Sequence, residues 1–315
     1  MLSGLPEHRR CCYRFDMINL SDNMRGAGFM AISMVAFTVN DAFMKLLGSM
    51  IPLPQALFLR GLGTVVFLAI LTWFMGQLRF NHSRKDWSLI GVRTAAEVAT
   101  TFFFLTALLH LPIANVSAVM QALPLTVSLA GAVFLGEALG WRRLAAILVG
   151  FVGVYLIIMP GADGFSVYSL YVVAAVLCVT LRDIVVRKMS PDVPSLMIGL
   201  VAATGVMLVG AALTATRPWV PVDAQTALYL AGAMGAIIFG YIFSVVAMRV
   251  GEIGFVAPFR YTSLVVALIL GWLVFGDWPT TLAMVGAFIV VATGLFTLYR
   301  ERQLRLKRPP SPRLR

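Results

Sequence analysis

Residues 113–158 read IANVSAVMQALPLTVSLAGAVFLGEALGWRRLAAILVGFVGVYLII and indicate the architecture of the chain. Two apolar runs, 113–135 and 142–159, flank a short turn that contains Gly136 and Glu137. Each run is close to the roughly 20 apolar residues that a helix needs to cross the hydrocarbon core of a bilayer. We therefore predict two membrane-spanning helices, which must be antiparallel neighbours because the turn between them is short.

The whole chain has this apolar character. Its 315 residues are 60% hydrophobic and 12% charged, with a mean hydropathy of +0.89. Soluble domains carry about 45–50% apolar and about 25% charged residues, so the composition excludes a water-soluble globule, a disordered chain and a nucleic-acid-binding domain. Three cysteines and three scattered histidines predict neither a disulfide framework nor a metal site. The sequence also lacks nucleotide, zinc and nucleophile-elbow motifs, and we expect no cofactor.

Ten apolar stretches predict an all-α integral membrane protein, because a helix satisfies its own backbone hydrogen bonds in the bilayer. The stretches are 26–47, 53–75, 88–110, 113–135, 142–159, 166–186, 194–215, 223–250, 253–275 and 280–299. Residues 1–25 form a polar tail without the features of a signal peptide, and Met1, Met17 and Met24 are each possible starts. Residues 300–315 form a basic C-terminal tail.

The net charge of +11 follows from where lysine and arginine fall. With a cytoplasmic N-terminus, the basic residues gather in both tails and in one set of loops, whereas the opposite loops hold only Arg217. This bias predicts that both termini are cytoplasmic and that the protein lies in a bacterial inner membrane. The charge thus reflects topology and contact with anionic lipid, rather than binding of nucleic acid.

The two halves of the chain resemble each other. Phe134-Leu135-Gly136-Glu137 recurs as Val274-Phe275-Gly276-Asp277, and Asn40-Asp41 followed by Lys45 recurs as Arg182-Asp183 followed by Arg187. Because each half has an odd number of spans, the second half enters the membrane upside down. We predict two inverted five-helix repeats, 26–160 and 161–299, which are typical of secondary transporters. A duplication retained for packing alone is the alternative.

These features resemble the EamA type of the drug/metabolite transporter superfamily. The resemblance rests on the ten spans, the two Gly-acid turns, Pro124, and the run from Tyr261 through Gly276-Asp277-Trp278-Pro279. It implies a gradient-driven carrier without nucleotide hydrolysis. Members export amino acids and other metabolites, or import compounds such as riboflavin or S-adenosylmethionine. Asp277 departs from the glutamate that is usual in the family, and we expect the shorter acid to keep the role.

Glu97 is the first candidate for a functional group, because an ionisable side chain inside a span is costly. At 1.5 Å per residue it lies about 14 Å into its stretch, close to the midplane. Arg93 lies one turn earlier on the same face and is expected to pair with it. Such a paired carboxylate suits proton coupling, whereas the alternative is a pair that only helps the helix to insert.

Arg60 and Arg260 are the next candidates. Arg60 has no charged counterpart in the second half, and its alternatives are a reach to the interface or a pairing with Asp41. Arg260 follows Pro258 and precedes Tyr261, at a point where proline is expected to bend the helix. Its guanidinium would hold a carboxylate or phosphate of a substrate, and snorkelling to the cytoplasmic face is the alternative.

Two further groups of residues complete the candidates. Asp41 with Lys45, and Asp183 with Arg187, are expected to form structural ion pairs within their helices. Asn40 and Gln121 offer neutral hydrogen bonds to a substrate. Five aromatic residues are expected mainly to pack or to meet lipid, and stacking on a planar ligand is the alternative: Phe102, Phe103, Phe104, Tyr241 and Trp272. The stripe Gly232, Ala236, Gly240 predicts a close helix contact.

The sequence favours a secondary carrier that moves a small organic metabolite by alternating access, with proton coupling through Glu97. Export of amino acids or related metabolites is slightly preferred over uptake of a vitamin- or nucleoside-like compound. A channel or an integral-membrane enzyme is the alternative of another class, although no cluster of His, Asp or Ser predicts catalysis. The expected partners are the substrate and membrane lipid, and both a monomer and a homodimer are compatible with the sequence.

Overall fold

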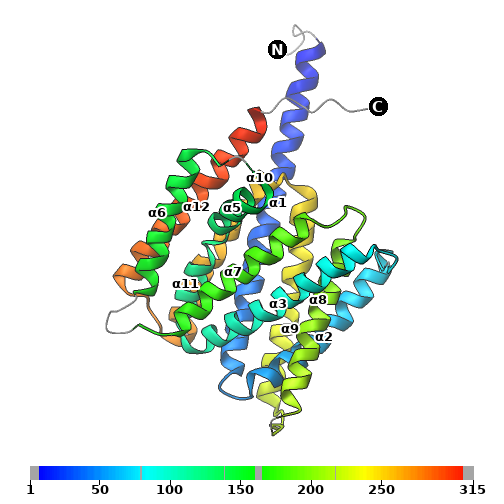
Figure 1. Ribbon diagram of the computed structural model, residues 1–315, viewed down its shortest axis with the longest axis vertical. Coiled ribbons are helices and arrows are strands. Elements are labelled where there is room, and N and C mark those ends of the chain that lie inside the picture. Colours follow the sequence, from blue (N-terminus) through cyan, green and yellow to red (C-terminus); the bar gives the residue numbers. More distant parts are fainter. Residues whose placement is uncertain (1–6, 79, 138, 160–164, 217, 308–315) are drawn as a thin grey trace.

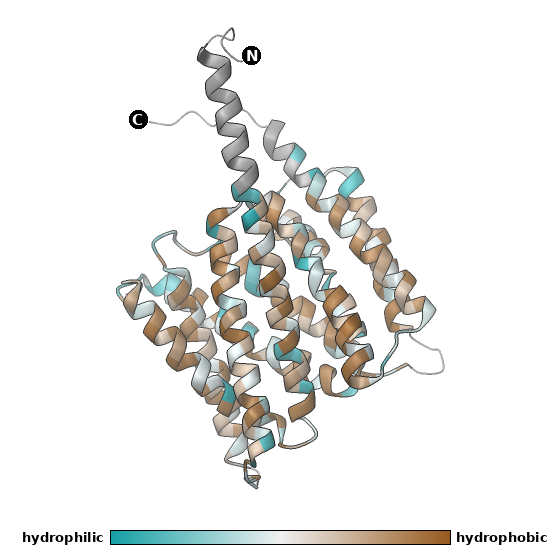
Figure 2. Cartoon of the chain, turned by 180° about the vertical axis from the view of Figure 1, so that it is seen from behind, coloured by the Kyte–Doolittle hydropathy of each residue, from teal (hydrophilic) through white to brown (hydrophobic). Residues whose placement is uncertain are grey.

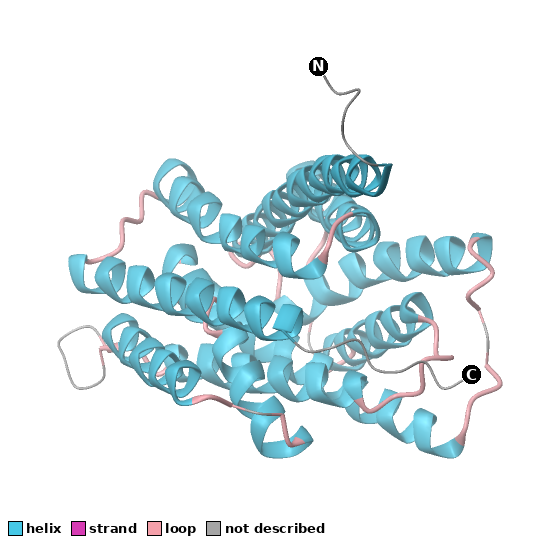
Figure 3. Cartoon of the chain, turned by 90° about the horizontal axis from the view of Figure 1, so that it is seen from above, coloured by secondary structure: helices cyan, strands magenta, loops and turns pink. Residues whose placement is uncertain are grey.

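The computed structural model describes residues 7–78, 80–137, 139–159, 165–216 and 218–307, and this part of the chain contains helices and loops without a strand (Figure 3). Ten segments within it are long and apolar enough to cross a membrane. They agree with the ten predicted stretches to within about one helical turn. In chain order the helices are α1 (Glu7–Leu47), α2 (Leu53–Phe74), α3 (Arg84–His110), α4 (Ile113–Met120), α5 (Leu123–Leu135), α6 (Trp141–Ile158), α7 (Tyr168–Arg187), α8 (Ser195–Thr214), α9 (Ala224–Val250), α10 (Ile253–Val256), η1 (Ala257–Tyr261), α11 (Thr262–Phe275) and α12 (Thr281–Lys307).

The first helix is longer than expected. α1 begins at Glu7, so it continues backwards from its apolar part, Asp22–Leu47, through most of the predicted polar tail. The first six residues of that tail lie outside the described residues. The N-terminal end of α1 and the C-terminal end of α12 lie at the same end of the bundle, as an even number of spans requires (Figure 1).

Two of the ten spans are interrupted, the fourth near its middle and the ninth nearer its N-terminal end. The ninth changes from α10 to the 3-10 helix η1 around Pro258, so the regular α-helix is interrupted at the proline where a bend was predicted. The fourth is broken between α4 and α5 at Gln121 and Ala122, just before Pro124, and this break was not predicted. Proline has no N–H to donate, and its ring clashes with the carbonyl group four residues earlier in a helix. Each proline therefore accounts for the interruption beside it.

The helices pair as two inverted halves require. α2 packs on α8, and α6 packs on α12, so the second and fifth spans of one half meet their own counterparts at opposite edges of the bundle (Figure 1). Between these edges, α1 packs on α9 and α3 packs on α7. These are equivalent contacts, because each joins the first span of one half to the third span of the other. The chain is therefore an all-α membrane protein built from two inverted five-helix repeats.

Small residues allow the closest of these contacts. A Cβ atom on Gly232 would come within 2.7 Å of the Phe43 ring, and one on Gly240 within 2.6 Å of the Phe37 ring. Ser33 donates a hydrogen bond of 2.8 Å to the carbonyl oxygen of Gly240. The predicted small-residue stripe on α9 is thus confirmed as the face that packs against α1.

The outer surface suits a lipid environment. Apolar residues cover most of the length of the helices (Figure 2). Large apolar side chains such as Trp141 and Phe288 are exposed. An exposed apolar surface of this extent is typical of contact with a membrane rather than with water.

Candidate functional site

A network of charged side chains joins the two halves at the centre of α3. Glu97 is the middle residue of that helix. Its Oε2 accepts a hydrogen bond of 3.1 Å from Nη1 of Arg182 on α7, and its Oε1 accepts one of 3.4 Å from the same atom. Arg93 Nη2 lies 3.6 Å from Glu97 Oε2, so the predicted pair within α3 is formed. Glu97 therefore ties the first half of the chain to the second.

Arg182 was not among the candidates, yet it makes the shortest contact to Glu97. It also donates from Nε to Oδ1 of Asp183 at 3.1 Å. The repeat contained a signal for this role, because Arg182 is the counterpart of the candidate Asn40.

The predicted ion pairs within α1 and α7 are wrong. Lys45 Nζ lies 3.6 Å from Asp277 Oδ2, and Arg187 Nη1 donates to Glu137 Oε1 at 2.9 Å. Each base thus pairs with the Gly-acid turn of the opposite half instead of the acid four residues earlier on its own helix. The reason is positional: both bases lie in the last turn of their helices, where the turn of the other half reaches them.

A second polar group lies between α1 and α2. Asn40 is buried, donates from Nδ2 to Oδ1 of Asp41 at 3.0 Å, and accepts a hydrogen bond of 3.3 Å from Nη1 of Arg60. Arg60 is also buried and interacts electrostatically with Asp41. Asn40 therefore lies between the two charges and bonds to both.

Tyr241 of α9 connects these two groups. Its phenol interacts electrostatically with Glu97, Arg60, Arg93 and Arg182, which come from three helices. Its ring packs edge-on against Phe37 with 5.6 Å between the ring centroids. Sequence reasoning favoured packing or lipid contact for this residue over stacking on a ligand, and no local pattern marks it as a neighbour of the charges. We call the residues Asn40, Asp41, Arg60, Arg93, Glu97, Arg182, Asp183, Tyr241 and Arg260 the polar cluster.

The two interrupted spans meet beside the polar cluster. Gln121, at the break of the fourth span, donates from Nε2 to Oγ of Ser263 at 2.7 Å. Ser263 is the second residue of α11, which forms the second part of the ninth span. Ser263 in turn donates to the carbonyl oxygen of Arg260 at 3.0 Å. The side chain of Arg260 is exposed and interacts electrostatically with Asp183.

Tyr261 lies next to this junction but is not part of the hydrogen-bond network. Its side chain is buried, and its hydroxyl has no hydrogen-bond partner among the described residues. The hydroxyl fits against Gly294 of α12, where a Cβ atom would collide with it. Tyr261 therefore offers one unused polar atom, and a larger residue at 294 would displace it.

Two Gly-acid turns close the ends of the bundle with the same backbone geometry. Gly136 and Gly276 both have φ of 67°. The N–H of Glu137 donates to Gly131 at 3.2 Å, and that of Asp277 donates to Gly271 at 2.9 Å. Besides its contact with Asp277, Lys45 Nζ donates to the carbonyl oxygen of Leu111 and lies over the Phe275 ring. We call these contacts the Lys45 end, and the contact of Arg187 with Glu137 the Arg187 end.

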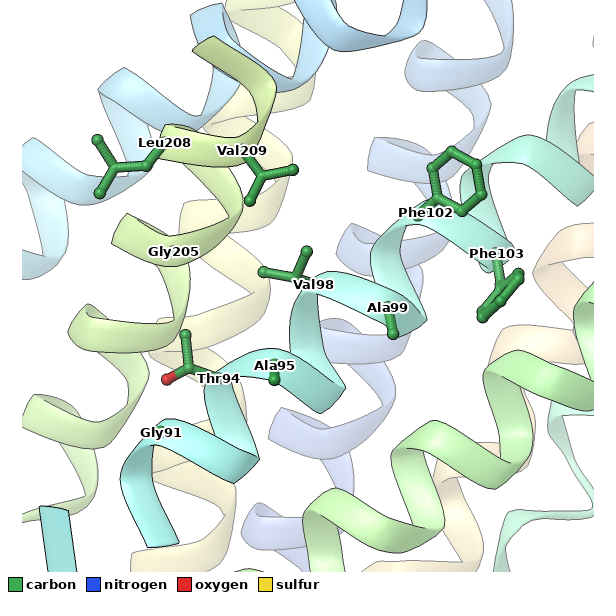
Figure 4. A pocket seen from close by; sticks show the side chains of 10 residues that line it. All are labelled: Gly91, Thr94, Ala95, Val98, Ala99, Phe102, Phe103, Gly205, Leu208 and Val209. Carbon is green, nitrogen blue, oxygen red and sulfur yellow. The ribbon is translucent and has the colours of Figure 1, made fainter. Parts of the chain in front are cut away.

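One apolar hollow is lined by no residue of the polar cluster. It has a volume of about 710 Å³ and lies between α3 and α8, where Thr94, Val98 and Phe102 face Gly205 and Leu208 (Figure 4). Of the residues singled out in the sequence, only the aromatic residues Phe102 and Phe103 are among the described residues that line it. Within the described residues no group of histidine, cysteine or acidic side chains is arranged to hold a metal ion.

Known proteins with related sequences and structures share this architecture. Residues 24–159 and 167–299 each match the EamA-like transporter family. An S-adenosylmethionine uptake transporter of Rickettsia conorii is 25% identical over 288 residues, which cover 90% of this chain and 96% of that protein. A riboflavin transporter of Vibrio cholerae is 29% identical over 296 residues, with coverage of 90% and 97%. One crystal structure superimposes with a TM-score of 0.58 at 18% identity over 90% of this chain and 99% of that one, which supports the fold alone.

Proposed function

Because this chain belongs to the EamA-like transporter family, we propose that it is an uptake carrier for a vitamin- or nucleoside-like compound in a bacterial inner membrane. The observation that carries this proposal is the polar cluster, which lies where the two inverted halves meet. Uptake takes precedence over export because the Rickettsia relative is an uptake transporter and the Vibrio relative carries riboflavin, a vitamin.

The interrupted spans support a substrate site at this place. Secondary transporters of inverted repeats bind near the midplane, where discontinuous helices expose backbone groups that an intact helix would use. Here Gln121 and Ser263 join two such interruptions, and Arg260 and Tyr261 are the last two residues of η1, within the second. We propose that Asn40, Gln121 and Tyr261 offer hydrogen bonds to the substrate, and that the arginines of the cluster hold its charged parts.

The two ends of the bundle support a mechanism of alternating access. With the termini cytoplasmic, as the basic loops predict, the Lys45 end faces outward and the Arg187 end faces the cytoplasm. Each end joins the first span of one half to the turn of the other half. We propose that the halves rock so that one end opens while the other stays closed, which exposes the polar cluster to one side at a time.

Glu97 is the proposed proton-coupling group. Its carboxylate ties α3 to α7 through Arg182. Protonation would remove the charge that holds this tie, so a proton that enters from outside would loosen the contact between the halves. The Glu97→Gln variant is expected to insert and to bind substrate, but to lose the dependence of flux on external pH. Unchanged pH dependence in that variant would remove Glu97 from the coupling mechanism.

Counterflow in proteoliposomes tests the proposed function. Purified protein is reconstituted with riboflavin or S-adenosylmethionine inside, and entry of the same compound in radiolabelled form is followed. A carrier gives saturable exchange of an unchanged compound, a channel gives flux that does not saturate, and an enzyme gives a chemically altered compound. Absence of exchange for every vitamin- and nucleoside-like compound in such a panel would refute the proposal.

A further inference from the structure

A groove on the outer surface lies between α5 and α7, with Phe151 of α6 at its side, and we call it the α5–α7 groove. It has a volume of about 490 Å³, within the range of about 300–1,000 Å³ that ligand pockets occupy. Buried side chains such as Thr180 and Ile184 form its floor, and exposed ones such as Phe134 and Leu181 form its walls. The groove is therefore recessed between the helices and open to the lipid.

The hydroxyl groups inside the groove are already used by the protein. Oγ1 of Thr126 lies 2.7 Å from Oγ1 of Thr180, so the two hydroxyls share a hydrogen bond. Thr180 also bonds to the carbonyl oxygen of Val176 at 2.8 Å. Apart from these threonines and Lys188, the residues that line the groove are apolar. An occupant therefore gains from apolar contact with the groove and not from hydrogen bonds to its floor.

The length of the groove suits an acyl chain. Its lining residues on α7 begin at Leu177, and the helix ends at Arg187. At 1.5 Å per residue this part of α7 is about 15 Å long. That length is close to half of the hydrocarbon core, which is about 30 Å thick in all. The groove can therefore hold a chain from one leaflet of the membrane along most of its length.

Lys188 supplies a positive charge at the end of the groove. It follows the last residue of α7, is exposed, and lines the groove. Its ammonium makes neither a hydrogen bond nor an ion pair within the described part of the chain. Of the acids nearby, Glu137 is bound by Arg187, and Asp192 accepts a hydrogen bond of 3.5 Å from Ser190. The charge of Lys188 is therefore available to an anion.

The symmetry of the repeat does not require this charge. Since Lys45 corresponds to Arg187, the counterpart of Lys188 is Leu46. The base therefore distinguishes the Arg187 end from the Lys45 end. The basic loops predict that the Arg187 end faces the cytoplasm, where anionic headgroups give the membrane a negative surface potential.

From the apolar groove and the base at its end we propose that the α5–α7 groove binds an anionic phospholipid of the cytoplasmic leaflet. One acyl chain lies between α5 and α7, and the phosphate of the headgroup lies at Lys188, which serves it as a point charge. Basic pockets between membrane helices on the cytoplasmic side bind anionic headgroups in this way. The inference goes beyond the proposed function, because it concerns lipid on the outside of the bundle and not the transported compound.

Photolabelling in nanodiscs tests the inference. The purified protein is reconstituted in phosphatidylcholine with a trace of phosphatidylglycerol or of phosphatidylcholine that carries the same diazirine on an acyl chain, and mass spectrometry locates the label after irradiation. The phosphatidylglycerol probe is expected to label the groove about fivefold more than the phosphatidylcholine probe, as the attraction of one lysine predicts. Exposed Val66 of α2, at the opposite edge of the bundle, should be labelled equally by both probes. Equal labelling of the groove would overturn the inference while the proposed function stands.

Variants separate recognition of the headgroup from recognition of the chain. Lys188→Gln is expected to remove the preference for phosphatidylglycerol and to leave labelling by the phosphatidylcholine probe unchanged. Lys85→Gln, at an exposed lysine that does not line the groove, is the matched control and should keep the preference. Ala130→Leu adds a side chain inside the groove and is expected to lower labelling there by both probes, without an effect at Val66. A preference that persists in Lys188→Gln, or that is lost equally in Lys85→Gln, would refute the role of Lys188, and unchanged labelling in Ala130→Leu would refute the place of the chain.

Discussion

The Lys45 end and the Arg187 end share one backbone turn but hold their charges differently. At the Lys45 end, the ammonium lies 3.6 Å from Asp277, donates to the carbonyl oxygen of Leu111, and lies 5.0 Å from the centroid of the Phe275 ring. At the Arg187 end, the guanidinium makes one contact of 2.9 Å, to Glu137. The side chain of Lys45 is 14% exposed, against 41% for Arg187.

A symmetric repeat therefore need not form contacts of equal strength at its two ends. Lys45 joins three segments in a partly buried setting, where loss of one partner leaves a poorly solvated group behind. Arg187 forms an exposed pair, and such pairs contribute only about 0.2–1 kcal/mol. We infer that this conformation is held mainly by the Lys45 end, and that the Arg187 end opens first.

We expect the largest difference between the two ends in the rate of substrate exchange when the basic side chain at each end is removed. Lys45→Met should lower the rate of substrate exchange about tenfold, because the loss of hydrogen bonds from a charged donor amounts to roughly 1.5–3 kcal/mol. Arg187→Met should lower it by no more than about fivefold, as expected for loss of an exposed pair. Counterflow rates measure both, with Lys85→Met as a control at an exposed lysine. Equal losses in the two variants would contradict the asymmetry.

A smaller difference is expected when the acid and the base of each ion pair are swapped and the recovery of transport is compared. In the double variant Arg187→Glu with Glu137→Arg, the single contact can form again, so most of the lost transport should return. In Lys45→Asp with Asp277→Lys, the new carboxylate cannot donate to the carbonyl of Leu111, so recovery should be partial and about 1 kcal/mol of coupling should remain lost. Double-mutant cycles on exchange rates measure this difference. Full recovery at the Lys45 end would show that Leu111 contributes nothing.

The effect of salt on these single variants gives a smaller difference between the two ends. At 1 M ionic strength the Debye length falls to about 3 Å, which screens exposed pairs far more than buried ones. Salt should therefore abolish the difference between wild type and Arg187→Met while leaving most of the difference between wild type and Lys45→Met. Exchange rates at low and high concentrations of an impermeant salt give the comparison. Loss of both differences in high salt would show that the Lys45 end is as solvated as the other.

Most of the fold was predictable, because the bilayer imposes a length and a polarity on every span. The break at Pro258 was predictable for a local reason, since proline acts on its own helix. The partners of Lys45 and Arg187 were not predictable from spacing on a helix. They come from the opposite half, and nothing in the four-residue spacing reports a contact that forms only when the halves assemble.

The contacts of the polar cluster also fall into those that the sequence predicts and those that it does not. Arg93 and Glu97 pair because they are neighbours on one helix, and the sequence shows this directly. Arg182 reaches Glu97 from another helix, although its equivalence to Asn40 in the repeat was a usable signal. Tyr241 carried no such signal, because an aromatic residue in an apolar span looks the same whether it faces lipid or charge.

Glycine replacements at the two turns should show the smallest contrast. Gly136→Ala and Gly276→Ala each place a side chain at a φ of 67°, where a left-handed backbone costs about 1–2 kcal/mol. An added Cβ would meet no atom within 4 Å at either position, so only the backbone contributes, and both variants should lose the same few degrees of thermal stability. Gly76→Ala, with φ of 63° outside both ends, is the matched control and should behave alike. If thermal unfolding showed a clearly larger loss at one turn, the difference between the two ends would lie in the turns themselves and not in the partners of Lys45 and Arg187.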